Sequence, residues 1–176
     1  MKDSIYSPKE DSFFFSQFLK EKKIKKNISF LDMGCGSCIL SDTLKKKGIK
    51  DITCVDINKE ATLLAKKKGY KSITSNLFKK IPKEKKFDLI CFNAPYLPED
   101  NREPKSSKII TTGGKKGDEI SIKFLKQAKK HLKKNGKIYL LISSLTPQKR
   151  INKFNLITVA RKKMFFEELK ILKMKN

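Results

Sequence analysis

A short run of residues that could hold a nitrogen-bearing substrate begins at Asn93, directly after an almost wholly apolar segment. The side-chain oxygen of Asn93 can accept a hydrogen bond from a planar NH2 group, and the carbonyl of Ala94 can accept from its second N–H. Pro95 keeps Ala94 in extended geometry, and the ring of Tyr96 can pack against the flat group. Such a site suits methylation of an amide or an aromatic exocyclic amine, where positioning and desolvation matter more than a strong base. The alternative is that Asn-x-Pro marks an ordinary turn.

A second candidate site is the glycine-containing stretch Leu-Asp-Met-Gly-Cys-Gly-Ser-Cys at residues 31–38, between a strand-like and a helix-like pattern. Gly34 and Gly36 allow a tight turn and let a ligand approach the backbone at a helix N-terminus. Asp56 ends the next strand-like run, where a carboxylate of a doubly wound sheet binds ribose hydroxyls. A nicotinamide enzyme is a poorer match, because Ile39 stands where a third glycine is needed. The alternative is a structural glycine turn followed by an ordinary aspartate.

Strand-like and helix-like patterns alternate along most of the chain and must position these residues. We expect strands at residues 28–33, 51–56, 71–75, 87–92, 137–142, 154–159 and 169–174, and helices at 12–20, 39–47, 59–68 and 118–134. Ser12 is the expected N-cap of the first helix, and Asn135-Gly136 the expected end of the last. The alternation predicts one α/β domain over residues 1–176, with a seven-stranded, mostly parallel sheet, helices on both faces and an antiparallel edge hairpin. The loop at 93–114 is long enough to indicate a functional site.

The chain is strongly basic, with 42 Lys and Arg against 18 Asp and Glu and a net charge of +24. Such a charge would suit nucleic acid or another polyanion. Only three of the 42 are arginine, the better residue for bidentate phosphate recognition, and many lysines fall where helices are expected to end. We therefore favour a lysine-biased composition, with nucleic acid allowed as a partner but not required. The apolar runs are too short to span a bilayer, so no membrane partner is expected.

Four cysteines do not form a secreted disulfide framework. Cys54 and Cys91 lie in apolar strand-like runs, where a free cysteine behaves as a small hydrophobe. Cys35 and Cys38 have the C-x-x-C spacing of redox and zinc sites. His131 is the only histidine and lies far away in sequence, so a standard zinc site lacks ligands. We expect no metal site and a reduced, cytoplasmic setting.

Three of these motifs together resemble those of class I S-adenosylmethionine-dependent methyltransferases. They are Asp32-Met-Gly-Cys-Gly-Ser-Cys38, Asp56 and Asn93-Ala-Pro-Tyr96. The chain is similar to the HemK-type N5-glutamine methyltransferases, in their short eukaryotic and archaeal form that methylates release factors. Further matches are Tyr6-Ser-Pro-Lys-Glu-Asp-Ser-Phe13, the segment Gly113-Gly114 with Gly117 and Glu119, and the tail at residues 160–169. The resemblance covers nearly the whole chain, although Asp118 stands where an arginine is usual.

This resemblance implies a Rossmann-like fold with S-adenosyl-L-methionine as the cofactor, covered by a helical segment at residues 1–27. Asp32 and the glycines would hold the methionine end, Asp56 the ribose and Asn76 the adenine amine. The full set of implied cofactor contacts is Ser12, Asp32, Gly34, Gly36, Asp56, Asn76, Leu77 and Asn93. The acceptor would be held by the catalytic residues Asn93, Ala94, Pro95 and Tyr96.

The chain departs from the family pattern at three positions. Cys38 replaces the third glycine of the loop. Asn76 replaces a usual aspartate, and its amide oxygen can still accept from the adenine amine. Ala94 replaces the first proline of Asn-Pro-Pro-Tyr. We expect activity to survive all three changes.

The resemblance implies N5-methylation of a glutamine side chain, with the Gly-Gly-Gln loop of a class-1 translation release factor as the substrate. It also implies a small zinc-binding activator protein as a heterodimer partner. Methylation of protein lysine remains an alternative, as does N6-adenine or rRNA methylation. The charge of +24 would suit an RNA substrate, but 176 residues leave no room for a separate target-recognition domain. The non-enzyme alternative is a basic RNA-binding scaffold with a degenerate cofactor site.

Overall fold

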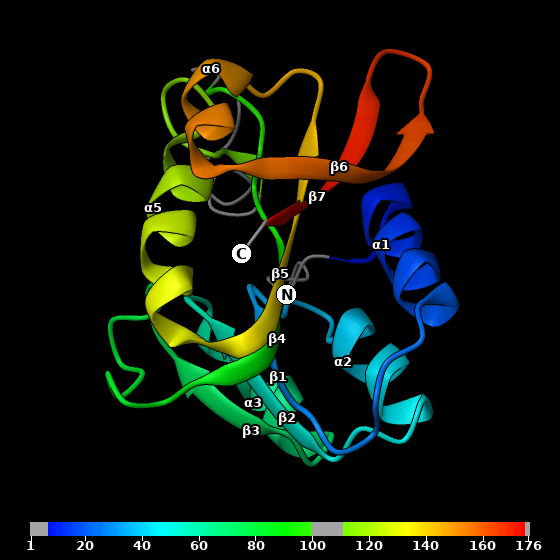
Figure 1. The fold of residues 1–176 in the computed structure, drawn as a ribbon, viewed down its shortest axis with the longest axis vertical. Helices are drawn as coiled ribbons and strands as arrows, with labels where there is room; N and C mark the ends of the chain where they lie inside the picture. The colour runs from blue at the N-terminus through cyan, green and yellow to red at the C-terminus, as the bar shows by residue number, and fades with distance from the viewer. Residues whose placement is uncertain (1–6, 100–110, 175–176) are drawn as a thin grey trace.

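A single seven-stranded sheet organises the computed structural model, which describes residues 7–99 and 111–174 (Figure 1). Tyr6 of the N-terminal motif and residues 100–110 of the expected loop lie outside the described residues. The strands are β1 (Ser29–Met33), β2 (Asp51–Asp56), β3 (Lys71–Thr74), β4 (Phe87–Asn93), β5 (Leu132–Ser143), β6 (Leu156–Lys163) and β7 (Glu168–Met174). Their spatial order is β3-β2-β1-β4-β5-β7-β6.

The pairing directions confirm the predicted topology. Strands β1 to β5 pair in parallel, β7 pairs antiparallel to β5, and β6 pairs antiparallel to β7. All five residues of β1 are buried, as are most of those of β4, which explains their nearly continuous apolar sequences. The antiparallel hairpin therefore closes one edge of an otherwise parallel sheet.

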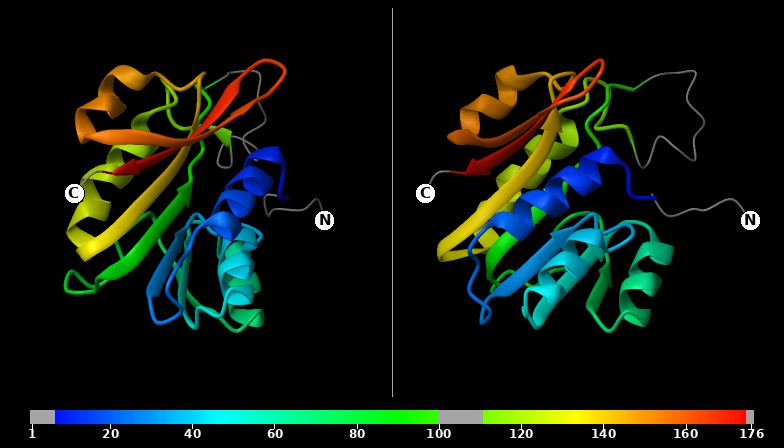
Figure 2. Two further views of the ribbon diagram at one scale, coloured as in Figure 1. Left: turned by 45° about the vertical axis from the view of Figure 1, so that its right-hand side comes forward. Right: turned by 90° about the vertical axis from the view of Figure 1, so that its right-hand side faces the viewer.

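Helices cover both faces of this sheet, also as predicted (Figure 2). On one face lie α1 (Glu10–Glu21), α2 (Ile39–Lys46) and α3 (Lys59–Lys67), and on the other lie α5 (Glu119–Ala128) and the short α6 (Gln148–Ile151). Each face has its own hydrophobic core. Phe15, Leu44 and Ala65 belong to the first, and Phe124 and Ile151 to the second. No helix in the described part of the chain is both long and apolar enough to cross a membrane.

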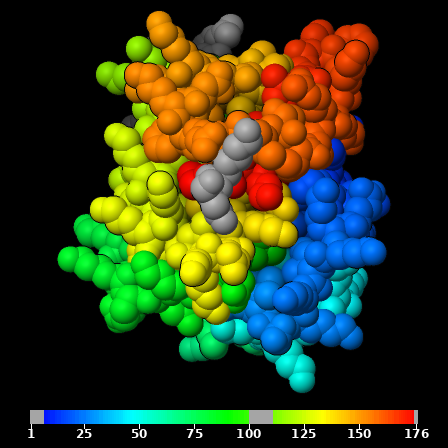
Figure 3. Space-filling model, in the orientation of Figure 1, coloured from blue at the N-terminus to red at the C-terminus, as the bar shows by residue number. Residues whose placement is uncertain are grey.

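The N-terminal helix α1 is attached to the body of the domain by its buried aromatic face. Phe15 and Leu19 are fully buried four residues apart, and the ring of Phe18 meets that of Tyr139 edge-on at 5.0 Å. The prediction that Ser12 caps this helix is wrong, because the cap position is Lys9 and Ser12 lies buried in the first turn. Figure 3 shows the β6–β7 hairpin directly above this N-terminal segment.

The end of helix α5 is the main correction to the predicted elements. The helix stops at Ala128, a 3-10 turn (Lys129–His131) follows, and Asn135-Gly136 lies inside β5. The ring of His131 stacks on Phe78 at 4.7 Å, which fixes the chain at this turn. A Cβ on Gly136 would lie 2.7 Å from the side chain of Leu132, so this glycine serves a close approach within the strand. The hairpin strand β6 also runs later than expected, to Lys163.

Candidate functional site

The two candidate motifs meet at one edge of the sheet. Strands β1, β2, β3 and β4 are parallel neighbours, and the motif residues lie at their carboxyl ends or directly after them. Met33 pairs with Val55 on one side and with Phe92 on the other, which places the glycine loop between Asp56 and Asn93. Ligands of open α/β sheets bind outside this edge.

The glycine loop after β1 is fixed by backbone hydrogen bonds and by a close approach. The amides of Gly34 and Cys35 both donate to the carbonyl of Val55, at 2.7 and 3.1 Å. Gly34 has φ +64°, and a Cβ there would lie 2.8 Å from the ring of Phe92. A side chain at Gly34 would therefore be strained by its backbone and blocked by its neighbour.

Asp56 at the end of β2 connects this loop to the next helix. One carboxylate oxygen accepts from the amide of Gly36 at 2.9 Å, and the other accepts from the amide of Asn58 at 2.8 Å. Burial raises the pKa of the Asp56 carboxyl, although these hydrogen bonds oppose the shift. Each oxygen keeps a further lone pair, so the group can still accept from a ribose hydroxyl.

Asp32 lies beneath the loop and is almost completely buried. Its carboxylate accepts from the amide of Ser41 at 3.1 Å and from the Ser41 hydroxyl at 2.6 Å, which fixes the first turn of α2. Burial raises the pKa of Asp32 well above its ordinary value. The contact of Asp32 with the methionine end of the cofactor stays a prediction.

The segment after β3 carries the two residues expected at the adenine. The amide of Ser75 donates to the carbonyl of Asp56 at 2.8 Å, so this segment leaves the sheet beside the ribose candidate. Asn76 is exposed, and Leu77 is buried with φ +50°. Their contacts with adenine stay predictions.

Asn93 is held by Asp11, which the sequence did not single out, and by Ser12, which it named only as a helix cap and an implied cofactor contact. Its Nδ2 donates to Asp11 Oδ2 at 3.0 Å and to Ser12 Oγ at 3.3 Å, both from the first turn of α1. Its Oδ1 is buried and has no hydrogen-bond partner within the described residues. Asp11 appeared in the sequence only as one letter of the N-terminal motif, because a contact across 82 positions leaves no local signal.

The residues after Asn93 are supported by the glycine-rich segment that precedes α5. The amide of Gly113 donates to the carbonyl of Leu97 at 2.9 Å, and a Cβ on Gly117 would lie 2.8 Å from the carbonyl oxygen of Tyr96. Burial, with Asp11 and Glu167 nearby, raises the pKa of Tyr96, so its hydroxyl stays neutral. Gly113 and Gly117 thus pack against the backbone of the expected acceptor loop.

Asp118, which stands where the family pattern has arginine, is fully buried next to these glycines. It accepts hydrogen bonds from both Nε and a terminal nitrogen of Arg150, the first at 2.8 Å. Arg150 also lies 3.3 Å from Glu119. Arg150 from α6 therefore pairs with the buried carboxylate of Asp118.

Three of the four cysteines converge beneath the glycine loop. The sulfur atoms of Cys35, Cys38 and Cys54 all lie within 4.8 Å of one another, and all three residues are buried. The sequence predicts Cys54 only as a small buried hydrophobe, because its approach to the other two depends on strand pairing. The expected absence of a metal stays a prediction.

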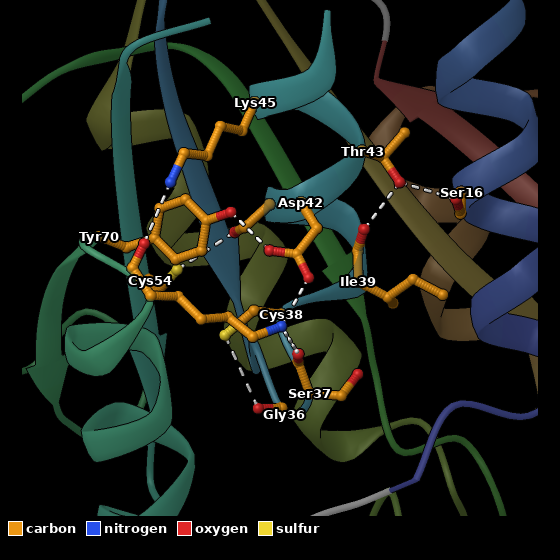
Figure 4. A network of polar contacts seen from close by, with 12 residues as sticks. Ser16, Gly36, Ser37, Cys38, Ile39, Asp42, Thr43, Lys45, Cys54 and Tyr70 are labelled. Atoms are coloured by element: carbon orange, nitrogen blue, oxygen red, sulfur yellow. Dashed lines mark hydrogen bonds and ion pairs between the residues drawn. The ribbon is translucent and has the colours of Figure 1, made fainter.

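A polar network ties the same loop to α3 (Figure 4). Asp42 accepts from Lys68 Nζ and from the Tyr70 hydroxyl, both at 2.6 Å. Lys68 Nζ also donates to the carbonyl of Ser37 at 3.0 Å. This lysine therefore has a structural partner on the loop, unlike a fully solvated residue at a helix end.

Comparison with known proteins agrees with this arrangement. Residues 10–170 match the family model described as methyltransferase small domain. A protein of Methanocaldococcus jannaschii named "Putative protein N5-glutamine methyltransferase" is 38% identical over an alignment of 182 positions that covers 96% of this chain and 90% of the relative. A release factor glutamine methyltransferase of Borreliella burgdorferi is 33% identical over 124 residues, covering 62% of this chain and 43% of the relative.

Solved structures share the fold at lower identity. The ribosomal protein L11 methylase of Lactobacillus delbrueckii superposes with a TM-score of 0.69 at 19% identity, covering 99% of this chain and 83% of that one. The 16S rRNA N2 G1207 methyltransferase of T. thermophilus, solved with AdoMet and guanosine, gives 0.68 at 18% identity, covering 97% and 44%. With the glycine loop, Asp56 and Asn93 gathered at one sheet edge, the chain belongs to the methyltransferase small domain family and is an S-adenosylmethionine-dependent methyltransferase similar to the HemK-type enzymes.

Proposed function

We propose that this methyltransferase transfers a methyl group to the side-chain nitrogen of a protein glutamine. The observation that carries the proposal is the buried Asn93 Oδ1, which has no partner in the described part of the chain. An unsatisfied buried acceptor costs about 1–3 kcal/mol, so a substrate that donates a hydrogen bond to this atom would be favoured. A primary amide provides two N–H donors on one planar nitrogen.

The neighbouring residues suit the rest of such an amide. The carbonyl of Ala94 can accept its second N–H, and Pro95 restrains the backbone that carries this carbonyl. The half-buried Tyr96 keeps a neutral ring that can pack against the flat group. An amide nitrogen has a delocalised lone pair, so alignment of the nitrogen and exclusion of water are the main contributions expected of these residues.

The chain also fits the cofactor, which supplies an electrophilic methyl group on a sulfonium. Gly34 leaves no room for a side chain beside Phe92, so backbone alone lines the loop there. We expect the methionine end to lie against Gly34 and Gly36, with Asp56 accepting from the ribose hydroxyls. Asn76 and Leu77 would hold the adenine, and Ser12 and Asn93 would adjoin the cofactor from the acceptor side.

A class-1 release factor with a Gly-Gly-Gln loop is the proposed protein substrate. Relatives from Fusobacterium nucleatum and Leptospira interrogans also carry the name release factor glutamine methyltransferase, which supports this substrate. The chain spans less than half the length of these two relatives and of the Borreliella relative. A zinc-binding activator stays a prediction, and the exposed Phe165 and Phe166 at the hairpin tip offer it an apolar contact.

The test is transfer of labelled methyl groups from S-adenosylmethionine. Three matched peptides that carry Gln, Asn or Lys after Gly-Gly are incubated with the protein, and the modified atom is located by mass spectrometry. Label on the Gln peptide alone supports the proposal. A second arm uses cell extract before and after RNase. Label that RNase removes would overturn the proposal in favour of the RNA methyltransferase that the net charge of +24 allows.

A further inference from the structure

We infer that Asp11 is a positioning residue that orients the Asn93 side chain and thereby makes the site select acceptors that donate N–H. This inference rests on the proposed function, because it concerns the same acceptor clamp. It adds helix α1 to the site as a functional element, beyond its expected place as a cover over the cofactor. Three observations carry it: the hydrogen bonds to Asn93, the fixed position of Asp11, and the Asn93 Oδ1 that has no partner among the described residues.

The first observation is the direction of the hydrogen bonds. A carboxylate only accepts, so the atom of Asn93 that lies 3.0 Å from Asp11 Oδ2 must be the nitrogen. Ser12 Oγ donates to Asp11 Oδ1 at 3.3 Å, which leaves this hydroxyl oxygen to accept from the same nitrogen at 3.3 Å. The chemistry of Asp11 therefore fixes which end of the carboxamide is the nitrogen, and a flip by 180° would place two acceptors against each other.

The second observation is that Asp11 is itself held in place. Asp11 is only 6% exposed, and its Oδ1 accepts a hydrogen bond from the amide of Ser12 at 2.7 Å. Farther along α1, the hydroxyl of Ser16 is hydrogen-bonded to that of Thr43 on α2 at 2.7 Å. Glu10 forms an ion pair with Lys162 of the hairpin at 3.2 Å. The last two contacts fix the helix as a whole, whereas the Ser12 amide holds the Asp11 carboxylate itself.

The third observation is what this orientation leaves for a substrate. With both Nδ2 bonds directed to α1, Oδ1 is the remaining polar group of Asn93, and it is a buried acceptor. A group that presents only lone pairs, such as a carboxylate, would meet this oxygen with repulsion. A group that presents N–H would satisfy it. Asp11 therefore acts on substrate choice through Asn93, without touching the substrate.

The experiment compares D11N, D11A and the control S16A in methylation of the Gln peptide. Asn at position 11 keeps the size of the side chain but can donate to Oδ1, so the carboxamide of Asn93 is free to flip. We expect kcat/KM to fall by about tenfold or more in both Asp11 variants, with cofactor affinity unchanged within about threefold. S16A removes a buried bond of the same helix that does not reach Asn93, and should keep normal kcat/KM per folded molecule.

A double-mutant cycle separates positioning from a merely structural role. Because Asp11 acts through Asn93, D11A should have no further effect on kcat/KM in the N93A background. The inference would be overturned if the losses of kcat/KM in D11A and N93A multiplied in the double variant. It would also be overturned if S16A lost as much kcat/KM as D11A. A second measurement does not depend on activity: the side-chain amide resonance of Asn93 in nitrogen-15 spectra, assigned by its loss in N93A, should shift strongly in D11A and little in S16A. An unchanged resonance would also overturn it, whereas a shifted resonance without any methylation of the Gln peptide would reject only the proposed function.

Discussion

The two halves of the sheet edge satisfy their polar groups in different ways. On the cofactor half, Asp56 accepts from the amides of Gly36 and Asn58, and Gly34 donates to Val55, so the loop is held by the protein itself. On the acceptor half, the nitrogen of Asn93 is bound by α1 while its buried oxygen has no partner among the residues described. The first half is formed before any ligand arrives. The second half keeps an acceptor without a donor among the described residues, and the N–H of a substrate amide would supply that donor.

The largest effect is expected from removing the unsatisfied group. Asn93→Ala should lower kcat by about 10²-fold or more, because the acceptor nitrogen loses its alignment, while cofactor affinity changes far less. Asn93→Asp keeps an acceptor oxygen and should retain part of the activity. The readouts are kcat per folded molecule and calorimetric cofactor affinity. Near-normal turnover in Asn93→Ala would mean that the Asn93 side chain does not hold the methyl acceptor.

The cofactor half should respond in affinity instead of turnover. Asp56→Ala removes the ribose acceptor and should weaken S-adenosylmethionine binding by about ten- to a hundredfold. In the unchanged protein, cofactor at 100 times its dissociation constant should stabilise the fold by about 2.7 kcal/mol, and NAD should not. Thermal unfolding with each ligand measures both.

Asp51→Ala is the matched control for this change. Asp51 begins the same strand and pairs with the exposed Lys71, away from the carboxyl edge. It should leave the cofactor-induced shift in Tm intact. A shift with NAD but none with S-adenosylmethionine would contradict the assignment of the whole half.

A smaller effect is expected where the loop passes Phe92. Gly34 and Gly69 both have positive φ, but a Cβ on Gly69 would meet no described residue within 4 Å, whereas one on Gly34 would lie 2.8 Å from the Phe92 ring. Gly69→Ala should therefore cost only the backbone strain of about 1–2 kcal/mol. Gly34→Ala should cost about 1 kcal/mol more and should also weaken cofactor binding. If denaturant unfolding gives the same loss of unfolding free energy for Gly34→Ala and Gly69→Ala, the Phe92 ring moves aside to make room for the new methyl group.

Features that depend on local sequence patterns could be predicted, and features that depend on tertiary contacts could not. The strands, their order of appearance and the glycine loop depend on local patterns, and the structure confirms the fold that they predict. The end of α5 was missed because Asn135-Gly136 is a helix stop by local rules, while its real role depends on packing against Leu132. Helix propensity alone cannot register such a tertiary contact.

Asp11 is a missed site residue, and the contacts of Ser12 and Cys54, both named from the sequence in other roles, were missed for the same reason. Asp11 and Ser12 reach Asn93 across more than 80 positions, and Cys54 reaches Cys35 and Cys38 only through the pairing of β1 with β2. Local rules took Ser12 for a helix cap, a role that needs no distant partner. Residues that act through such long-range contacts give no periodic signal, so the acceptor half was only partly predictable.

The smallest effect concerns the titration of Asp32, which is buried on the cofactor half of the sheet edge. The pKa of Asp32 is raised by burial, so the folded protein binds this proton more tightly than the unfolded chain does. Its contribution to stability is therefore fully present below the ordinary pKa near 4 and is lost as pH rises through the folded-state pKa. Asp32→Asn does not titrate and keeps an oxygen that can accept from Ser41.

The expected result is that the Tm of Asp32→Asn, measured against the unchanged protein, rises as pH increases from about 4 toward 7. Asp88→Asn is the control of opposite sign. Burial works against ionisation of Asp88, but hydrogen bonds from Lys133 and Ser29 outweigh it and lower its pKa. The ionised Asp88 contributes stability above the ordinary carboxyl pKa, and this contribution is lost as pH falls. The Tm of Asp88→Asn, measured against the unchanged protein, should therefore decrease as pH rises. If the Tm difference between Asp32→Asn and the unchanged protein does not vary with pH, folding does not raise the pKa of Asp32.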